Sequence, residues 1–188
     1  MEEIYRTLEE YARTYVIALS AVLLTVALPV TALAGTPPQV TAVSPVDAGR
    51  YLVIVGGCND CHTPAYAETG GQVPEDEWLT GVPVGWRGPW GTTYASNLRL
   101  IVQSLSEEAF LEVLRSRKQR PPMPWPNVNQ LNPADAAAIY QYIRSLGPKG
   151  QAMPTAVAAD VEPATPYFLF VPQQPVSLQS TVTAPTTQ

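Results

Sequence analysis

The stretch Cys58-Asn59-Asp60-Cys61-His62 decides how the rest of the chain must be arranged. It has the C-x-x-C-H spacing that is typical of covalent attachment of a c-type haem. Two thiols on one turn can each form a thioether with the same porphyrin, and the adjoining imidazole then falls under the iron as the proximal ligand. The motif uses both cysteines and the only histidine of the chain. The sequence therefore predicts one covalent haem c, with its iron, held by Cys58, Cys61 and His62.

Two other interpretations of this motif are a thioredoxin-like dithiol and half of a structural zinc site. A redox dithiol belongs in a βαβ context, which the pattern of the surrounding residues does not show. Structural zinc takes four ligands, and three Cys or His residues in one tight turn cannot supply them. Haem attachment is the interpretation that the motif favours.

Length and charge narrow the class of protein further. The 188 residues suffice for one domain with appendages, and the formal net charge is −5. Binding to nucleic acid needs a basic face, so no nucleic-acid partner is expected.

Residues 1–34 are predicted to be an export segment, either a signal peptide or an N-terminal membrane anchor. The run 16–34 is almost entirely apolar and ends in Ala32-Leu33-Ala34, a small-x-small cleavage pattern. An uncleaved anchor is the alternative, because a run of this length can just span a bilayer. Pro29 and the cleavage pattern favour removal. In both cases the haem domain is expected in the periplasm or on the outer face of the cytoplasmic membrane.

The remaining chain is predicted to comprise a linker (35–43), a haem domain (44–148) and a Pro/Thr-rich tail (149–188). The tail should be extended or disordered, because it carries little charge and many prolines. The apolar stretch 167–171 is the exception and should pack as an extended segment on the domain or on a partner.

The predicted fold is all-α: a small domain of three main helices and long loops around one covalent haem. Each helix has an N-cap residue, namely Ser44, Ser106 and Asn132, and an apolar stripe. The three helices are expected to run from Ser44 to Gly56, from about Glu107 to Arg117 and from Asn132 to Gly147. Residues 63–96 carry few helix signals and are rich in Gly, Pro and Trp, so we expect a long loop that packs on the porphyrin.

The sixth ligand of the iron is predicted to be Met123. It lies in the run Pro121-Pro122-Met123-Pro124, whose prolines fix the backbone and can hold one thioether in a set position. The competitors are Met1, which is lost or distant, and Met153 in the tail. Four basic residues precede Met123 and either form a basic collar near the haem edge or only complement a helix dipole. They are Arg115, Arg117, Lys118 and Arg120.

At this point the residues resemble a known family, the class I c-type cytochromes of the single-haem bacterial kind. The order of helix, C-x-x-C-H, long loop, helix, Pro-rich loop with Met and final helix is that of the family. The stretches 91–98 and 121–124 are similar to those in cytochrome subunits of periplasmic dehydrogenases. The resemblance covers about residues 44–148.

The resemblance implies a set of haem contacts around the axial ligands His62 and Met123. A proline carbonyl usually orients the proximal imidazole in this family, and Pro89 is the candidate here. Trp90, Tyr94 and Asn97 have donors that could reach the haem propionates.

The resemblance also implies that the first and last helices cross. Gly49 and Tyr51 would meet Ile139 and Tyr142 at this crossing.

The predicted function is that of a one-electron carrier, not an enzyme by itself, although it could be a subunit of an oxidoreductase complex. Its partners would be a dehydrogenase as donor and an oxidase or another cytochrome as acceptor, with membrane attachment through residues 16–34 as an option. The alternative is a five-coordinate haem protein with peroxidase or gas-binding activity. That alternative requires Met123 to be displaced and a distal polar group to be present. A third interpretation, in which the tail docks a partner, is compatible with the first.

Overall fold

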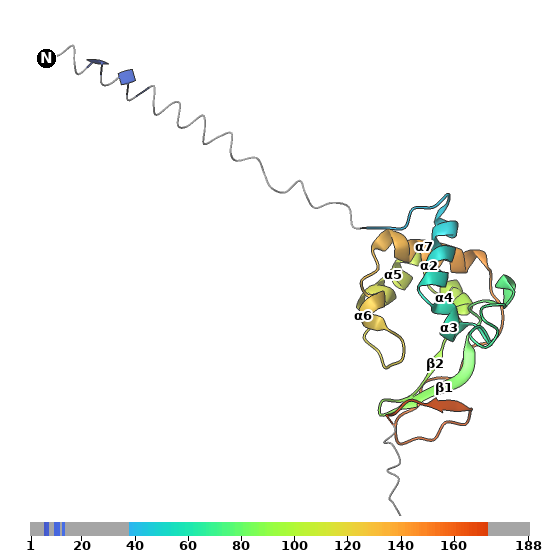
Figure 1. Ribbon diagram of the computed structural model, residues 1–188. Coiled ribbons are helices and arrows are strands. Elements are labelled where there is room, and N and C mark those ends of the chain that lie inside the picture. Colours follow the sequence, from blue (N-terminus) through green and yellow to red (C-terminus); the bar gives the residue numbers. More distant parts are fainter. Residues whose placement is uncertain (1–5, 8–9, 12, 14–37, 173–188) are drawn as a thin grey trace, which may run out of the picture. The chain divides into compact units, whose positions relative to one another are not determined.

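The structure is a computed structural model, which describes residues 6–7, 10–11, 13 and 38–172 (Figure 1). The chain divides into two compact units, Met1–Pro37 and Pro38–Gln188, and the second contains the C-x-x-C-H motif. In the described part of the chain, no helix is long and apolar enough to cross a membrane. The predicted export segment or anchor at residues 16–34 lies outside the described residues.

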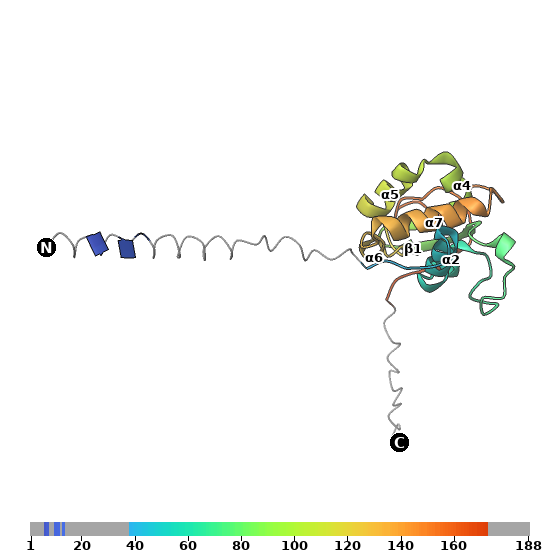
Figure 2. The ribbon, with the colours of Figure 1, turned by 90° about the horizontal axis from the view of Figure 1, so that it is seen from above.

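Two crossed helices form the centre of the second unit. Helix α2 (Pro45–Val55) packs across α7 (Pro133–Ser145), and Figure 2 shows α7 between α2 on one side and α4 and α5 on the other. At the crossing, a Cβ on Gly49 would lie 2.0 Å from a main-chain oxygen of α7 and 2.7 Å from Cβ of Tyr142. Only glycine fits there, so the predicted meeting of Gly49 with Tyr142 is confirmed. Tyr51 is 53% exposed.

Four shorter helices surround this pair. They are α3 (Cys58–His62), α4 (Leu98–Ser104), α5 (Glu107–Ser116) and α6 (Trp125–Val128). Helix α5 is the predicted second helix, while α4 and α6 were not predicted. The core lies between α2, α4, α5 and α7. Its fully buried members include Val53, Leu79, Val102, Tyr142 and Ile143.

The loop predicted at 63–96 contains a β-hairpin, so the domain is not purely all-α. Strand β1 (Val82–Gly88) pairs antiparallel with β2 (Gly91–Ala95), and β3 (Tyr167–Leu169) pairs parallel with β1, giving the order β2-β1-β3. The segment is rich in the β-branched and aromatic residues that favour strands. Its glycines and prolines led to the prediction of a loop, but part of them form the turn between the two strands.

Residues 149–172, here called the strap, run from the end of α7 down to the hairpin (Figure 1). Apart from β3 they have no regular secondary structure, and hydrogen bonds to the hairpin hold them. Thr92 and Val157 exchange two backbone hydrogen bonds of 2.9 and 3.0 Å. The Trp86 ring packs on Phe168 with 5.1 Å between ring centroids. The prediction that 167–171 packs on the domain is therefore confirmed, whereas 173–188 lie outside the described part.

The end of the predicted linker contacts the start of α7. The backbone N–H of Val40 donates to Asp135 Oδ1 at 2.9 Å, and Asn132 Nδ2 donates to the Pro38 carbonyl at 2.6 Å. Asn132 is also the N-cap of α7, as predicted, because its Oδ1 accepts from the N–H of Asp135 at 2.9 Å. The N-cap of α7 therefore also anchors the incoming chain.

Candidate functional site

The two cysteines lie on the five-residue helix α3, one turn apart and both partly exposed. No disulfide joins them. Burial raises the pKa of Cys58 to about 11 and also raises the pKa of Cys61. A redox dithiol needs a depressed thiol pKa, because the thiolate is the nucleophile. The electrostatics of this pair therefore oppose a thioredoxin-like role.

His62 ends the same helix, and its imidazole is 8% exposed. Its Nδ1 lies 2.7 Å from the backbone oxygen of Ser96. A carbonyl can only accept, so Nδ1 carries the proton and Nε2 has a free lone pair. Burial lowers the pKa of His62, while the bond to Ser96 opposes that change. The site therefore holds a neutral imidazole whose Nε2 can bind a metal.

The backbone around His62 is fixed by hydrogen bonds to one neighbouring segment. The N–H of Gly81 donates to the His62 carbonyl at 2.7 Å. The Thr63 hydroxyl donates to Asn59 Oδ1 at 2.8 Å and accepts from the N–H of Leu79 at 2.8 Å. Leu79 is fully buried at a positive φ of 61°, a backbone conformation that the surrounding contacts must stabilise. The proximal side is thus supported from several directions.

The predicted role of Pro89 is wrong in detail, because the carbonyl that orients His62 is that of Ser96. Pro89 is exposed and lies in the turn between β1 and β2. The hairpin carries the chain out to this turn and back again. The residue directly after β2 is therefore the one that reaches the imidazole.

The three residues predicted to contact propionates have different surroundings. Both amide protons of Asn97 are used by backbone carbonyls, those of Lys149 at 2.8 Å and Gln151 at 3.1 Å. The hydroxyl of Tyr94 is hydrogen-bonded to that of Thr165 at 2.8 Å. Trp90 Nε1 is buried and has no acceptor among the described residues. Asn97 therefore has no donor left for a propionate, and the roles of Trp90 and Tyr94 stay predictions.

Met123 is half-buried in the segment between α5 and α6. Its carbonyl accepts from the N–H of Trp125 at 2.8 Å. The Thr93 hydroxyl donates to the Pro121 carbonyl at 2.7 Å and links the segment to β2. Further along, Asn129 Nδ2 donates to a main-chain carbonyl of α5 at 2.6 Å. The segment that carries Met123 is thus tied to β2 and to α5.

Met153, the competing methionine, lies in the strap. With Ser96 and Asn97 it lines a cleft of about 230 Å³ beside α4. This cleft is on the Nδ1 side of His62, since Ser96 is the partner of that nitrogen. Met153 therefore lies on the side of the ring nitrogen that is already hydrogen-bonded, and not on the side of Nε2.

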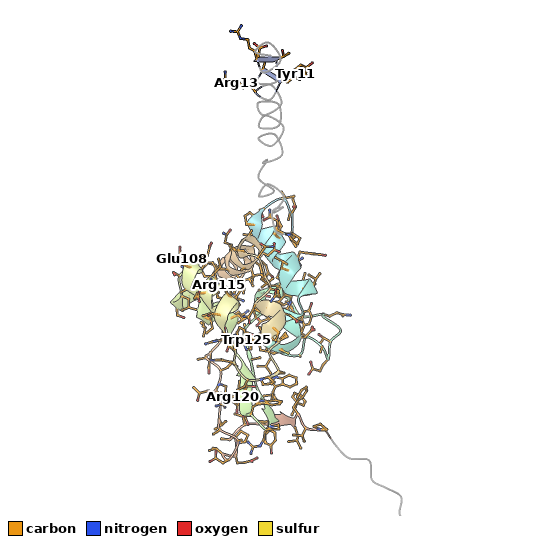
Figure 3. The ribbon with its side chains drawn as sticks, turned by 90° about the vertical axis from the view of Figure 1, so that its left-hand side faces the viewer. Tyr11, Arg13, Glu108, Arg115, Arg120 and Trp125 are labelled. Carbon is orange, nitrogen blue, oxygen red and sulfur yellow. The ribbon has the colours of Figure 1, made fainter. Side chains whose placement is uncertain are left out.

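The arginines of the basic collar contact neighbouring groups of the protein, which the sequence alone does not show. Arg115 pairs with Glu112 on the same helix, and the Arg117 guanidinium lies 5.6 Å from the centre of the Trp125 ring. Arg120 donates to a strap carbonyl at 3.1 Å. Figure 3 shows Arg115, Trp125 and Arg120 along one side of the unit. These positive charges stay exposed, but their contacts hold the side chains.

Sequence reasoning missed Ser96 and Gly81, which act through their backbones and so leave no side-chain signal. It also missed Arg99, which is 4% exposed and donates to the carbonyls of Gly147, Leu146 and Asp76. This guanidinium satisfies carbonyls at the C-terminal end of α7. The N-cap Asn97 ahead of an apolar run was the one available signal for α4.

Two thiols on one turn beside a neutral, oriented imidazole are the donor set that a covalently attached haem requires, and the fold and site thus define a haem-carrying domain. The family model described as Cytochrome c matches residues 46–147. The chain belongs to this family, as a class I c-type cytochrome, and binds haem c with its iron through Cys58 and Cys61. No curated protein and no solved structure matches the chain.

Proposed function

We propose that this chain is a one-electron carrier in which His62 and Met123 ligate the haem iron. The observation that carries the proposal is the 2.7 Å bond between His62 Nδ1 and the Ser96 carbonyl. It fixes the tautomer and leaves the Nε2 lone pair for the metal. When bound, the haem supplies the one-electron couple, and a thioether ligand such as that of Met123 raises the reduction potential.

The residues around the site have two tasks in this proposal. The Ser96 carbonyl orients the imidazole and makes it a stronger ligand. The proline-rich segment presents the Met123 thioether and, by occupying the sixth position, prevents a substrate from binding there. A saturated metal suits a carrier, because oxidation and reduction then require no change of ligand.

A five-coordinate haem protein remains the alternative function. It would need an open sixth position and a polar distal side chain. His62 is the only histidine of the chain, so a distal histidine is not available. This fact favours the carrier.

The ligation of the ferric protein tests the proposal directly. We expect a six-coordinate low-spin spectrum with the magnetic circular dichroism of His/Met ligation, and slow binding of cyanide. A high-spin spectrum with rapid cyanide binding would support the alternative and overturn the proposal.

We also propose that the protein works outside the cytoplasmic membrane, in the periplasm or anchored through residues 16–34. The apolar run and the cleavage pattern support this location. Its donor would be a dehydrogenase and its acceptor an oxidase or another cytochrome. The mass of the mature N-terminus and co-purification from native membranes test these statements. Recovery of the full-length chain in the cytoplasm would contradict the location.

A further inference from the structure

Two groups hold His62, and the strap bonds to Asn97, which follows the first group, and packs on Gly81, which supplies the second. One group is the Ser96 carbonyl, which accepts from Nδ1, and the other is the Gly81 N–H, which donates to the His62 carbonyl. Neither of these two groups belongs to α3, the helix that carries His62. The strap lies outside the 46–147 match to the family.

Asn97 connects the segment of the Ser96 carbonyl to the strap. Its Oδ1 accepts from the N–H of Leu100 at 3.1 Å, which caps α4. Its Nδ2 donates to the strap carbonyls of Lys149 at 2.8 Å and Gln151 at 3.1 Å. The side chain is 2% exposed. One buried amide therefore joins the residue after Ser96 both to α4 and to the strap.

Close packing connects Gly81 to the same part of the strap. A Cβ on Gly81 would lie 2.6 Å from Cγ of Met153 and 2.7 Å from the backbone nitrogen of Asn97. A Cβ on Gly150, whose φ is 76°, would lie 3.2 Å from Nδ2 of Asn97. The strap, Gly81 and Asn97 thus form one packed group directly behind His62.

We propose that Asn97 is a positioning residue for the proximal ligand, and that residues 149–153 of the strap act through it. The Ser96 carbonyl lies in the short link between β2, which ends at Ala95, and α4. The bonds of Asn97 to the strap fix this link and so set the strength of the hydrogen bond from His62. The inference deepens the proposed function and rests on His62 as an iron ligand.

The physical consequence is a change in the character of the imidazole. A strong bond from Nδ1–H to a carbonyl makes the ring a better electron donor, which favours the ferric state. When the link moves and this bond weakens, the potential rises. The Nδ1 proton also loses its protection and exchanges faster with water.

The decisive variant is Asn97→Ser in the haem-loaded protein. Serine is a good N-cap and can still accept from Leu100, but it is too short to reach both strap carbonyls. We expect the exchange of the His62 Nδ1 proton, followed by NMR in the ferrous state, to become about fivefold faster, which is the effect of losing one hydrogen bond. The midpoint potential should shift upward.

Two controls separate positioning from general loss of stability. Ser106→Ala removes the N-cap of α5, which accepts from Ala109 at 3.2 Å, a bond that does not involve His62. Lys149→Gln removes the ion pairs to Asp76 and Glu77 but keeps the main-chain carbonyl that Asn97 uses. Both controls should keep the wild-type exchange rate and potential.

A second variant covers the case in which Asn97→Ser fails to attach haem. Gly150→Val pushes a side chain toward Asn97 from the strap side and should change exchange and potential in the same direction. Wild-type values in these variants, or equal changes in Ser106→Ala, would overturn the inference. The proposed function fails separately, and only if the wild type lacks His/Met ligation.

Discussion

The two sides of the haem site are held in different ways. On the His62 side, the Ser96 carbonyl holds the buried imidazole, and the Gly81 N–H holds the main-chain carbonyl of His62. On the Met123 side, a half-buried side chain lies in a proline-rich segment outside regular secondary structure. The first side is built from strands, a helix cap and the strap, whereas the second lies between the ends of two short helices and is tied to β2 and to the strap by single hydrogen bonds.

Under the proposed ligation, this difference separates a ligand that the scaffold fixes, His62, from one that it leaves adjustable, Met123. Hydrogen bonds to buried groups are costly to break, so the imidazole should stay in place while the thioether is exchanged. Local opening begins where contacts are few. Changes to the Met123 side should therefore alter ligation, and changes to the His62 side should alter the strength of a ligand that remains bound.

Removal of the haem is expected to have the largest effect, because it takes away what both sides contact. In Cys58→Ala or Cys61→Ala, and most of all in the double variant, we expect loss of a cooperative unfolding transition in urea or heat. The Met123 segment then has no porphyrin against which to pack. Cooperative unfolding with native-like hydrogen-exchange protection in the apo-protein would contradict this prediction.

Replacement of the adjustable ligand comes next. Met123→Ala should keep the haem attached, change the spin state and lower the potential by on the order of 0.1 V, a fraction of the range that axial ligands span. Met153→Leu, which keeps an apolar side chain against Gly81, is the matched control. If Met153→Leu changes the spin state and Met123→Ala does not, the two methionines have been assigned the wrong way round.

Substitution of Asn129 can weaken the attachment of the Met123 segment without changing Met123 itself. Its Nδ2 donates to the carbonyls of Leu114 at 2.6 Å and Arg117 at 3.3 Å, which joins the end of α5 to α6. Asn129→Ala should speed the displacement of Met123 by imidazole about fivefold, since one lost hydrogen bond costs about 1 kcal/mol. Stopped-flow absorbance measures the rate. Asn97→Ser should leave it unchanged, and an equal acceleration there would erase the distinction between the two sides.

The basic collar should affect encounters with partners more than ligation. Changing Arg115, Arg117, Lys118 and Arg120 together to Gln should slow electron transfer with an acidic partner by up to about tenfold at low salt. The effect should fade as the Debye length shrinks below roughly 10 Å near 0.1 M salt. An unchanged rate and salt dependence in stopped-flow experiments would leave these residues with only a structural role.

The smallest effect concerns acid stability near the His62 side. Arg50 and Tyr142 both donate to Glu75, and the bond from Arg50 is the main cause that lowers the pKa of Glu75 from 4.5. A lowered pKa contributes stability above about pH 4.5 that disappears as the pH falls through the folded value. For this partly exposed pair the contribution is about 0.5 kcal/mol.

Urea unfolding of Glu75→Gln at several pH values tests this contribution. The amide oxygen can still accept from Tyr142, so the variant removes mainly the charge. The deficit of the variant should be present at pH 6 and vanish near pH 3. A deficit that does not depend on pH would show that packing, not ionisation, matters at this position.

The sequence predicted those features of the fold that depend on the type of side chain at one position. Ser44, Ser106 and Asn132 were recognised as caps, and each accepts the expected backbone N–H. The C-x-x-C-H spacing identified the haem, and Gly49 marked the helix crossing because no larger residue fits there.

Features that depend on main-chain atoms could not be predicted in the same way, because every residue has the same main-chain groups. Pro89 was chosen because prolines usually supply the proximal carbonyl, but any residue has a carbonyl, and the path of the hairpin selected Ser96. Asn97 carries a strong cap signal, yet its bonds to the strap depend on a chain segment more than fifty positions away. Tertiary pairing of this kind leaves no local pattern in the sequence.

The parallel pairing of β3 with β1 has a consequence for the order in which the molecule is built. Gly85 pairs with Tyr167, so this contact closes one of the longest loops of the domain. Contacts between distant residues form late, because the entropy of loop closure must be overcome first. During synthesis, Cys58 and Cys61 emerge long before the strap can settle behind Ser96. We therefore expect the thioethers to form on a nascent chain that is still open on the proximal side, with the strap completing the domain afterwards.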